Sequence, residues 1–499
     1  MWAARRFSLH LSDFSRGPAS RLWLRRLQMH YLVRVLKRLT RSARIRYRYY
    51  AYWRSQEKMA SECSTERLKE IQWARLNKLL NYAYERIPLY RDKFSEAGVR
   101  PDDIATRRDF RQIPVLTKDE IRQSFPDRIL NGQRSFPSSM MGQTSGSTGD
   151  SLHFVRPDQQ WQCSVLYSVL LRTNGLSNTP VMVFSTPHCT AATCSIAEDE
   201  ESEDPPIGKF QRIRFLRHLD GEPIGLPPSE NIMRASADYM ERVRRIVSYF
   251  APCLIIADPV YLGSFARYLR DGDAPVPALE GIISTYELLT PSLEELLRDV
   301  FGCPVYTQYG ASEVPDIANE CEHGRLHVRM NNVLVEVIRD GRPAEPGEVG
   351  KIVVTDLRNY NMPFIRYDIG DLAVRHEGPC ECGRNTGTLG RIRGRARDVI
   401  LTNGSTDGDV LTPLQADRVF HGVPGIDAYR LVQRTKHSYD ISVMPNAGAE
   451  TIDQQTIVNR SRDLLGAESW FNIRTVPEIK PERSMKFRFV YSELTGASL

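Results

Sequence analysis

Short apolar runs alternate with amphipathic segments of helical period between residues 181 and 306, and this order constrains the fold more than any other feature of the sequence. Runs of about four apolar residues have the length of buried strands and are too short for helices. The predicted strands are 181–184, 254–257, 281–284 and 305–306, and the predicted helices are 234–250, 260–269 and 292–300. Because parallel strands need crossover connections, this order predicts an α/β fold with a parallel sheet, which binds ligands beyond the carboxyl ends of its strands.

From Val333 onward, short β-branched runs and turns replace this alternation. Valines at 333, 335 and 337 lie on one face of a predicted strand, Asp340-Gly341 is typical of a hairpin turn, and a second run follows at 352–354. The pattern predicts a β-rich subdomain.

Past Arg397 a smaller α/β unit is predicted, with strands at 429–432 and 439–443 and a helix at 451–465. The chain of 499 residues is too long for a single hydrophobic core. We therefore predict a basic N-terminal arm at residues 1–60, a large domain at 61–396 and a small, mobile C-terminal domain at 397–499.

A loop rich in glycine and hydroxyl side chains precedes the first predicted strand of the sheet. Its central residues are Thr144, Ser145, Gly146, Ser147, Thr148 and Gly149. Glycine allows close backbone approach, so that successive N–H groups and the hydroxyls can surround phosphate oxygens. The loop lacks the Gly-Lys-Ser/Thr ending of a Walker A motif, and a flexible Ser/Gly linker is the alternative interpretation.

Two further stretches carry carboxylates beside glycines. Tyr309-Gly310-Ala311-Ser312-Glu313 closely follows a predicted strand, which suits Ser312 to a phosphate and Glu313 to a magnesium ion; a turn with a solvent-facing Glu is the alternative. Residues 366–371 end in Gly370-Asp371 and could bind ribose hydroxyls, or form an Arg-Asp structural pair.

Two basic stretches lie nearer the C-terminus. Residues 390–398 alternate Gly and Arg, which fits either a nucleic-acid patch or a hinge between domains. Lys486 lies in the stretch Arg-Ser-Met-Lys-Phe-Arg, and a lysine in such a place is by itself usually solvated.

Taken together and in this order, the stretches resemble the adenylate-forming enzyme superfamily, in the branch of phenylacetate-coenzyme A ligases and capsule-biosynthesis relatives. The resemblance covers residues 65–495 and includes the stretch 357–363, which is typical of this branch. It implies that Glu313 holds Mg²⁺, that Thr144 to Gly149 and Ser312 contact phosphate, that Tyr309 and Gly310 lie in the nucleotide site, and that Lys486 is the mobile catalytic lysine. It also places Asp371 and Arg395 at the ribose. We expect no nucleic acid as a partner.

The sequence departs from the family pattern at three places. Asp150-Ser151 follows the loop where relatives often have Pro, Arg397 with Asp398 occupies the hinge position that is often Asp, and Met485 precedes the lysine where a small residue is usual. The second change bears on domain rotation, and the third bears on the room around Lys486.

The resemblance implies a two-step reaction. A carboxylic acid, of an aryl or related kind, attacks the α-phosphate of ATP to form an acyl-adenylate, and a thiol, first of all that of coenzyme A, then takes the acyl group after the small domain rotates. Transfer to a carrier protein, an amine or a sugar in polymer or metabolite assembly is the alternative with the same chemistry. A non-catalytic nucleotide-binding or membrane-docked adaptor is the alternative of another class.

Cysteine and histidine spacing suggests a metal site. Cys321 and His327 in one stretch and Cys380 and Cys382 in another provide three thiols and an imidazole, the ligand set of a closed tetrahedral Zn²⁺ site. His323 could replace His327, and unrelated reduced thiols are the alternative. Some relatives in this branch carry such a zinc, which would join the β-rich subdomain to the sheet domain without taking part in the chemistry.

Charge is concentrated in the arm. Residues 1–60 contain fifteen Lys and Arg but two acidic residues, a net charge of +13, whereas the whole chain has +6. Leu24, Leu27, Tyr31, Val35 and Leu39 recur at helical intervals, which predicts a basic amphipathic helix. It would contact an anionic membrane surface, act as a targeting segment, or pack on the body of the protein.

The nine scattered cysteines, without a clear secretory signal, indicate a cytoplasmic protein, with peripheral membrane contact through the arm left open. No apolar run approaches the length of a spanning helix. A homodimer is also left open.

Overall fold

The computed structural model describes residues 50–132, 139–144, 151–157, 171–172, 179–186, 224–227, 229, 231–272, 274–406, 408–446, 448–449, 451–482 and 486–494, with the side chains of 403–409 left out. The predicted amphipathic helix of the arm, Ser145 to Gly149 of the glycine-rich loop, and Met485 lie outside these residues.

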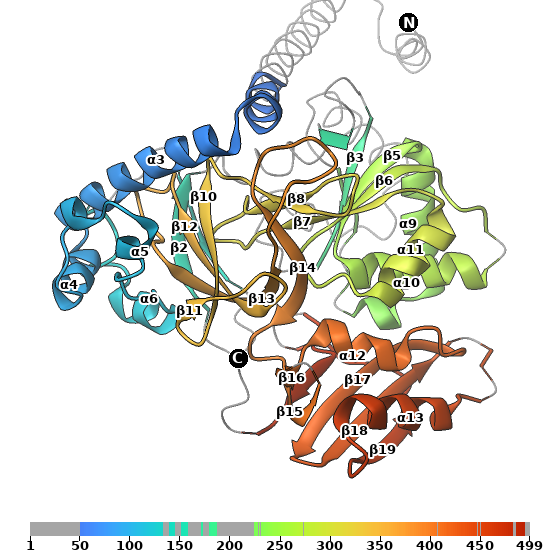
Figure 1. Ribbon diagram of the computed structural model, residues 1–499. Helices are drawn as coiled ribbons and strands as arrows, with labels where there is room; N and C mark the ends of the chain where they lie inside the picture. The colour runs from blue at the N-terminus through green and yellow to red at the C-terminus, as the bar shows by residue number, and fades with distance from the viewer. Residues whose placement is uncertain are drawn as a thin grey trace, which may run out of the picture.

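The parallel strands predicted from the alternating pattern are present (Figure 1). Their order is β4 (Ile224–Gly225), β3 (Val181–Phe184), β5 (Cys253–Ala257), β6 (Leu279–Ser284) and β7 (Val305–Tyr309). The helices that follow in the chain are α9 (Ala237–Phe250), α10 (Pro259–Asp271) and α11 (Pro291–Phe301), with the short η4 (Ile232–Arg234) before them. The α/β prediction is therefore confirmed.

The β-rich region continues the same sheet in antiparallel fashion. The order beyond β7 is β8 (Ala318–Glu320), β9 (Leu326–Val328), β14 (Thr388–Arg395), β13 (Tyr367–Arg375), β12 (Val349–Asp356), β10 (Val333–Arg339) and β11 (Arg342–Pro343). Asp340 and Gly341 both have positive φ and join β10 to β11, as the hairpin signal predicts. The predicted β-rich region is therefore the antiparallel half of one mixed sheet of twelve described strands.

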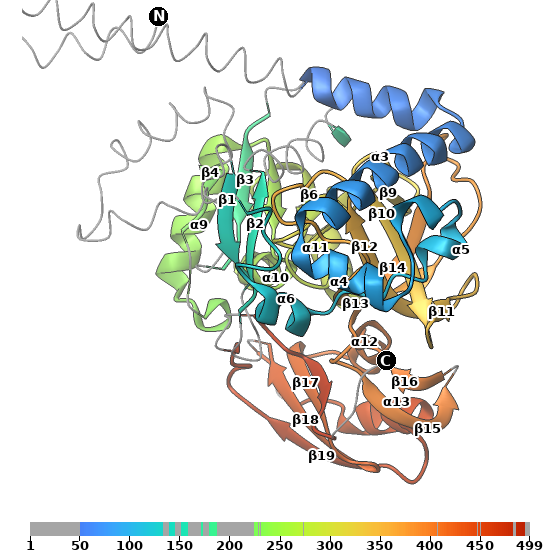
Figure 2. The same ribbon diagram turned by 90° about the vertical axis from the view of Figure 1, so that its left-hand side faces the viewer.

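Helices near the N-terminal end cover the antiparallel half of the sheet (Figure 2). They are α3 (Thr65–Arg86), α4 (Pro88–Glu96), η1 (Pro101–Asp103), α5 (Arg107–Phe110) and α6 (Lys118–Ser124). Ile87 is extended between α3 and α4, as expected of the residue before a proline. Thr117 caps α6 and exchanges hydrogen bonds with Glu120, which fixes the start of that helix.

The C-terminal part forms a separate four-stranded sheet below the large one (Figure 1). The strands of this sheet are β17 (Ile426–Thr435), β18 (Ser438–Pro445), β19 (Trp470–Thr475) and β20 (Val490–Ser492). The same part contains a two-stranded sheet, β15 (Ile400–Thr406) and β16 (Gly408–Leu411), and the helices α12 (Pro413–Phe420) and α13 (Gln454–Leu465). It has a core of its own. Ala428, Met444, Ile479 and Phe487 join instead the core beneath α9 to α11, so an apolar contact links the two parts. The boundary at residue 396/397 stays a prediction.

Residues 50–62 are helical and pack on the antiparallel half of the large sheet. Arg329 donates to the Tyr52 hydroxyl (3.2 Å) and to Gln56 Oε1 (3.3 Å). Asn385 Nδ2 donates to the carbonyls of Ser61 (3.2 Å) and Cys63 (3.0 Å), past the end of this helix. These residues of the predicted arm therefore pack on the protein. Within the described part of the chain, no helix combines the length and the hydropathy needed to cross a membrane.

Candidate functional site

A cavity of about 840 Å³ lies at the carboxyl ends of β5, β6 and β7, between the large sheet and the C-terminal part. All of the described residues predicted for the nucleotide site line it. They are Thr144, Tyr309, Gly310, Ser312, Glu313, Asp371, Arg395 and Lys486. Ser145, Gly146, Ser147, Thr148 and Gly149 lie outside the described residues. The structure thus brings together residues that are up to 342 positions apart in the sequence.

The ends of the glycine-rich loop are held by the strands that flank it, β1 (Ser139–Gln143) and β2 (His153–Pro157), which pair antiparallel. Thr144 N–H donates to the Leu152 carbonyl (2.9 Å), and Leu152 N–H donates to the Thr144 hydroxyl (2.9 Å). The two bonds close the base of the loop at the edge of the cavity.

The motif Tyr309–Glu313 starts at the last residue of β7. A Cβ at Gly310 would lie 2.4 Å from the Pro315 carbonyl oxygen, so the tight backbone there requires glycine. Glu313 is buried and accepts a hydrogen bond of 2.7 Å from the Tyr367 hydroxyl. Burial and the Glu313 carboxylate hold the pKa of Tyr367 well above its ordinary value, so the phenol remains a donor that orients Glu313.

Asp371 and Arg395 are partners across strands β13 and β14, with 4.0 Å between Arg395 Nε and Asp371 Oδ1. Burial opposes the charge of Arg395, but Asp371, Asp398 and Glu287 outweigh that effect and raise the pKa of its guanidinium. A permanent positive charge therefore lies beside a carboxylate at one wall of the cavity.

Lys486 enters the cavity from the C-terminal part, where its Nζ donates to the Tyr286 carbonyl (3.3 Å). Phe487 N–H donates to Glu287 Oε1 (3.2 Å), which fixes the backbone beside the lysine. Burial and nearby Arg395 lower the pKa of Lys486. Burial and Asp258 raise the pKa of Glu287 well above its ordinary value. Tyr286 and Glu287 also line the cavity.

The predicted hinge is held by the segment that carries the lysine, just before β20. Arg488 donates to the Arg397 carbonyl (3.2 Å) and to the Asp398 carboxylate. Asp398, next to the Arg that replaces the usual Asp, therefore provides an anchored carboxylate in this orientation.

Lys118 is a cavity residue that the sequence does not indicate. It is the first residue of α6, and a Cβ at Gly370 would lie 3.3 Å from its Nζ. Burial lowers its pKa, while Glu313, Asp371 and Asp368 act in the opposite sense. Thr117 caps this helix, but no local signal in the sequence places this amine beside Gly370 and Asp371 of β13.

The four predicted zinc ligands form one cluster, separate from the cavity. One ligand atom from each of Cys321, His327, Cys380 and Cys382 lies within 4.8 Å of the others. The Cys321 and Cys380 sulfurs are 3.6 Å apart, and Cys382 Sγ is 3.2 Å from His327 Nε2. His323, the alternative to His327, is not part of the cluster, and its ring lies 3.4 Å from Glu381.

The cluster fits a tetrahedral metal ion. Burial lowers the pKa of His327 to about 4, so the imidazole is neutral as a metal ligand must be. His327 Nδ1 lies 2.8 Å from the Thr386 hydroxyl, which orients the ring and leaves Nε2 facing the thiols.

Curated proteins with similar sequences cover most of the chain. No protein-family model matches the sequence. The phenylacetate-coenzyme A ligase of Thermus thermophilus is 27% identical over 387 residues, which are 75% of this chain and 80% of that protein. The enzyme of the same name from Escherichia coli is 26% identical over 356 residues, or 68% and 74%. The chain is therefore a homologue of phenylacetate-coenzyme A ligases, as its motifs indicate.

Solved structures show the same fold. A 2-hydroxyisobutyryl-CoA ligase in the postadenylation state, in complex with 2-HIB-AMP, has a TM-score of 0.68 and 19% identity, and the match covers 88% of this chain and 92% of that one. The same ligase in the thioesterification state, with 2-HIB-AMP and CoA, has a TM-score of 0.55 at 20% identity and the same coverage. The fold is that of adenylate-forming ligases, and the match to the postadenylation structure has the higher TM-score of the two.

Proposed function

We propose that this protein is an AMP-forming acid–thiol ligase, which activates a carboxylic acid with ATP and transfers the acyl group to coenzyme A. The observation that carries the proposal is the single cavity in which Glu313, Asp371, Arg395 and Lys486 converge. The homology to phenylacetate-coenzyme A ligases supports the same reaction class and an acid of the aryl kind.

In the first step, an oxygen of the substrate carboxylate attacks the α-phosphorus of ATP, the bond to the bridging oxygen breaks, and pyrophosphate leaves. Two anions must approach each other, so the site needs positive charge where the negative charge of the transition state develops. Lys486, Arg395 and Lys118 line the cavity and supply that charge. We assign Lys486 to the reacting phosphate, because it alone of the three belongs to the C-terminal part.

The remaining cavity residues have binding roles in this proposal. Thr144 with the loop to Gly149, together with Ser312, contacts the phosphates, and Asp371 accepts from the ribose hydroxyls. Glu313 would hold Mg²⁺, because its carboxylate is buried at the cavity and is oriented by Tyr367. When bound, Mg²⁺ would neutralise phosphate charge.

In the second step, the sulfur of coenzyme A attacks the acyl carbon of the adenylate, a thioester forms, the thiol proton is released and AMP leaves. Here Lys486 closes one side of the cavity, where it contacts Tyr286. We propose that the C-terminal part rotates about Arg397-Asp398 between the two steps, which opens that side to the thiol.

The Cys₃His cluster supports a structural Zn²⁺ ion. It joins the turn after β8 to the loop between β13 and β14, so a metal would fix that corner of the sheet. Free thiols in this cluster also support a reducing, cytoplasmic location. The charge of residues 1–49 supports contact with an anionic membrane surface.

ATP–pyrophosphate exchange tests the proposal. Each of a set of aryl and fatty acids is incubated with the protein, ATP, Mg²⁺ and labelled pyrophosphate, and exchange that depends on one acid is the expected result. Adding coenzyme A to that acid should then yield the thioester, detected by mass spectrometry. Exchange without thioester would favour a carrier protein, amine or sugar as acceptor, and no exchange with any acid would favour the adaptor alternative.

A further inference from the structure

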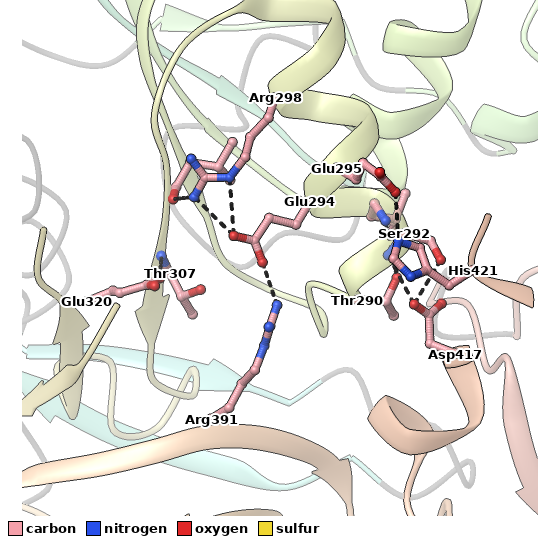
Figure 3. A network of polar contacts seen from close by, with 12 residues as sticks. Thr290, Ser292, Glu294, Glu295, Arg298, Thr307, Glu320, Arg391, Asp417 and His421 are labelled. Atoms are coloured by element: carbon pink, nitrogen blue, oxygen red, sulfur yellow. Dashed lines mark hydrogen bonds and ion pairs between the residues drawn. The ribbon is translucent and has the colours of Figure 1, made fainter. Parts of the chain in front are cut away.

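A buried carboxylate of the C-terminal part contacts the start of a helix of the large sheet domain. Asp417 of α12 is fully buried, and its Oδ2 accepts from the backbone N–H (3.0 Å) and the hydroxyl (2.8 Å) of Ser292 (Figure 3). Its other oxygen, Oδ1, accepts from the Tyr429 hydroxyl (2.9 Å). Three donors therefore compensate for the burial of this charge.

The position of Ser292 makes this contact favourable. Ser292 is the second residue of α11, where backbone N–H groups have no partner within the helix. The Thr290 side chain accepts from Leu293 N–H, and Asp417 provides the acceptor for Ser292 N–H. A carboxylate here also interacts favourably with the helix dipole. The C-terminal part thus completes the capping of a helix in the large domain.

Helix α11 is a fixed base for this contact. Glu294 pairs with Arg391 of β14, and Arg298 donates to the Val305 carbonyl of β7 (3.1 Å), so one face of the helix is attached to two strands of the large sheet (Figure 3). A change at the Asp417 contact would therefore move the C-terminal part and leave α11 in place.

The same segment of the large domain receives Lys486. The connection from β6 to α11 spans residues 285–290, and its start is contacted by Lys486 and Phe487, through Tyr286 and Glu287. Asp417 binds just past its other end, at Ser292. Two distant segments of the C-terminal part thus hold one short connection at both ends, which fixes the orientation of that part relative to the cavity.

Other polar contacts across this boundary are more exposed. His421 pairs with Glu295 (2.6 Å), but 41% of the histidine side chain and 57% of the glutamate side chain are exposed. Exposed ion pairs of this kind contribute little. Asp427 pairs with Arg267 (3.3 Å) in a less exposed contact. Of the acidic groups in these three contacts, only Asp417 is fully buried and accepts hydrogen bonds from a helix N-terminus.

We propose that Asp417 is a positioning residue, whose contact with Ser292 holds the C-terminal part in the orientation that places Lys486 in the cavity for acyl-adenylate formation, and that this contact must break before thioester formation. The inference rests on the proposed function. The greater similarity to the postadenylation state than to the thioesterification state of the solved ligase agrees with it. The contact can break and form again at low cost. Tyr429 lies in the same part as Asp417, so its hydrogen bond to the carboxylate remains when water replaces Ser292.

The test compares the two half-reactions in Asp417→Asn, Asp417→Ala and Ser292→Ala proteins. The first half-reaction is measured as single-turnover pyrophosphate release with phenylacetate, benzoate and hexanoate as probe acids. The second is measured from the synthetic adenylate of the active probe acid and coenzyme A, which bypasses the first. Loss of a charged hydrogen bond should shift the orientation by about 10-fold to 100-fold. Asp417→Ala should therefore slow the first half-reaction by about 10-fold and leave the second equal or faster.

Tyr429→Phe is the matched control, because it removes the third hydrogen bond of Asp417 but leaves both bonds to Ser292. It should lower the melting temperature without changing the ratio of the two half-reactions. An equal fall of both half-reactions in the Asp417 and Ser292 variants, or the same change of ratio in Tyr429→Phe, would overturn the proposal. Asp417→Asn and Ser292→Ala are the milder variants if Asp417→Ala does not fold.

A disulfide provides a second test, and its first readout, the yield of the cross-link, needs no knowledge of the acid. The double variant Ser292→Cys with Asp417→Cys should form a cross-link under mild oxidation, measured by peptide mass spectrometry, and neither single variant should form it. Oxidation should lower thioester formation by about 10-fold or more, and dithiothreitol should restore it. Absence of the cross-link, or thioester formation that the cross-link does not change, would refute the proposal that this contact must break before thioester formation. If no acid supports exchange, the proposed function fails, while the cross-link yield still tests the contact itself.

Discussion

Tyr309 and Asp371, 62 residues apart in the chain, are joined by a hydrogen bond of 3.0 Å in which the phenol donates to Oδ2 of the carboxylate. Tyr309 is the last residue of parallel strand β7, and Asp371 lies within antiparallel strand β13. The bond therefore ties the proposed phosphate-binding motif to the proposed ribose contact across the mixed sheet. The geometry of the nucleotide site depends on both halves of that sheet.

Tyr309→Phe should raise the KM for ATP by about 10-fold or more, because a hydrogen bond to a charged group contributes roughly 1.5–3 kcal/mol. The turnover number should change less, since neither residue is assigned to the reacting phosphate. Initial rates at varied ATP concentration measure the effect. Tyr82→Phe is the matched control, because it also removes a bonded hydroxyl but does not line the cavity. Equal KM values in the two variants would contradict the ribose assignment of Asp371.

Lys486→Ala should slow acyl-adenylate formation by a factor on the order of 10² to 10³, the usual effect of losing one preorganised charge. The measurement is ATP–pyrophosphate exchange, with the melting temperature recorded to show that folding is intact. Lys480→Ala removes an exposed lysine of the same part, and it should leave the exchange rate unchanged. An unchanged rate in Lys486→Ala would remove this lysine from the mechanism.

The pH dependence of exchange should show the lowered pKa of Lys486, which burial and Arg395 cause. The charged amine is the active form, so the rate is complete below the pKa of the folded protein and falls as pH rises through it. This fall should occur at lower pH than for an ordinary lysine. Lys486→Arg keeps its charge, and its rate, although reduced, should show no such fall between about pH 7 and pH 10. An identical alkaline fall in that variant would assign the titration to another group.

Local signals predicted two parts of the site, one at the end of strand β7 and one within strand β13. Tyr309 to Glu313 and Gly370-Asp371 are marked by glycines next to β-branched or aromatic runs, and the structure places them in one cavity. Strand β7 extends through Thr307 and Gln308, which the prediction left out. These polar residues lie in the strand because Gln308 pairs with Asn319 of β8, and such pairing has no signal in the local sequence.

Long-range contacts explain the other differences. Lys118 lies in the cavity because α6 packs beside Gly370 of β13, about 250 residues later in the chain. The metal cluster could be predicted from its ligand types, but not the choice between His323 and His327. That choice depends on the pairing of β9 with β14, in which His327 is the partner of Thr388 and faces the cysteine loop.

Purified protein should contain about one zinc ion per chain if the Cys₃His cluster binds the metal. Cys382→Ser should reduce the zinc content strongly, and chelation should lower the melting temperature of the unmodified protein, because the metal binds only the folded cluster. Metal analysis by mass spectrometry measures the content. Cys303→Ala, a buried cysteine outside the cluster, should keep its zinc. Protein never exposed to chelator that holds no zinc would leave the four residues as ordinary thiols and an imidazole.

Two truncations should distinguish the role of the helix at residues 50–62 from the role of residues 1–49. Removal of residues 1–63 also removes the Tyr52 and Gln56 acceptors of buried Arg329, and it should lower the melting temperature more than removal of residues 1–49.

In vesicle co-sedimentation with anionic lipid, the full-length protein should bind more than the protein that lacks residues 1–49. This difference should shrink as added salt shortens the screening length to about 8 Å or less. Salt-insensitive binding shared by both proteins would exclude the membrane-surface role.

The contacts that hold the helix at residues 50–62 also set an order of events on the ribosome. Thr65 and the carbonyls of Ala60 and Cys63 are bound by Asn385, which follows Thr65 by 320 residues. At about 5–20 residues per second, the ribosome needs roughly 16–64 s to add that length of chain. Until residues 329–385 have been made, the new helix lacks the complete surface on which Gln56 and Ala60 are buried. The apolar side of the helix is then available to chaperones. The helix can pack in its final place only after the antiparallel half of the sheet has been synthesised.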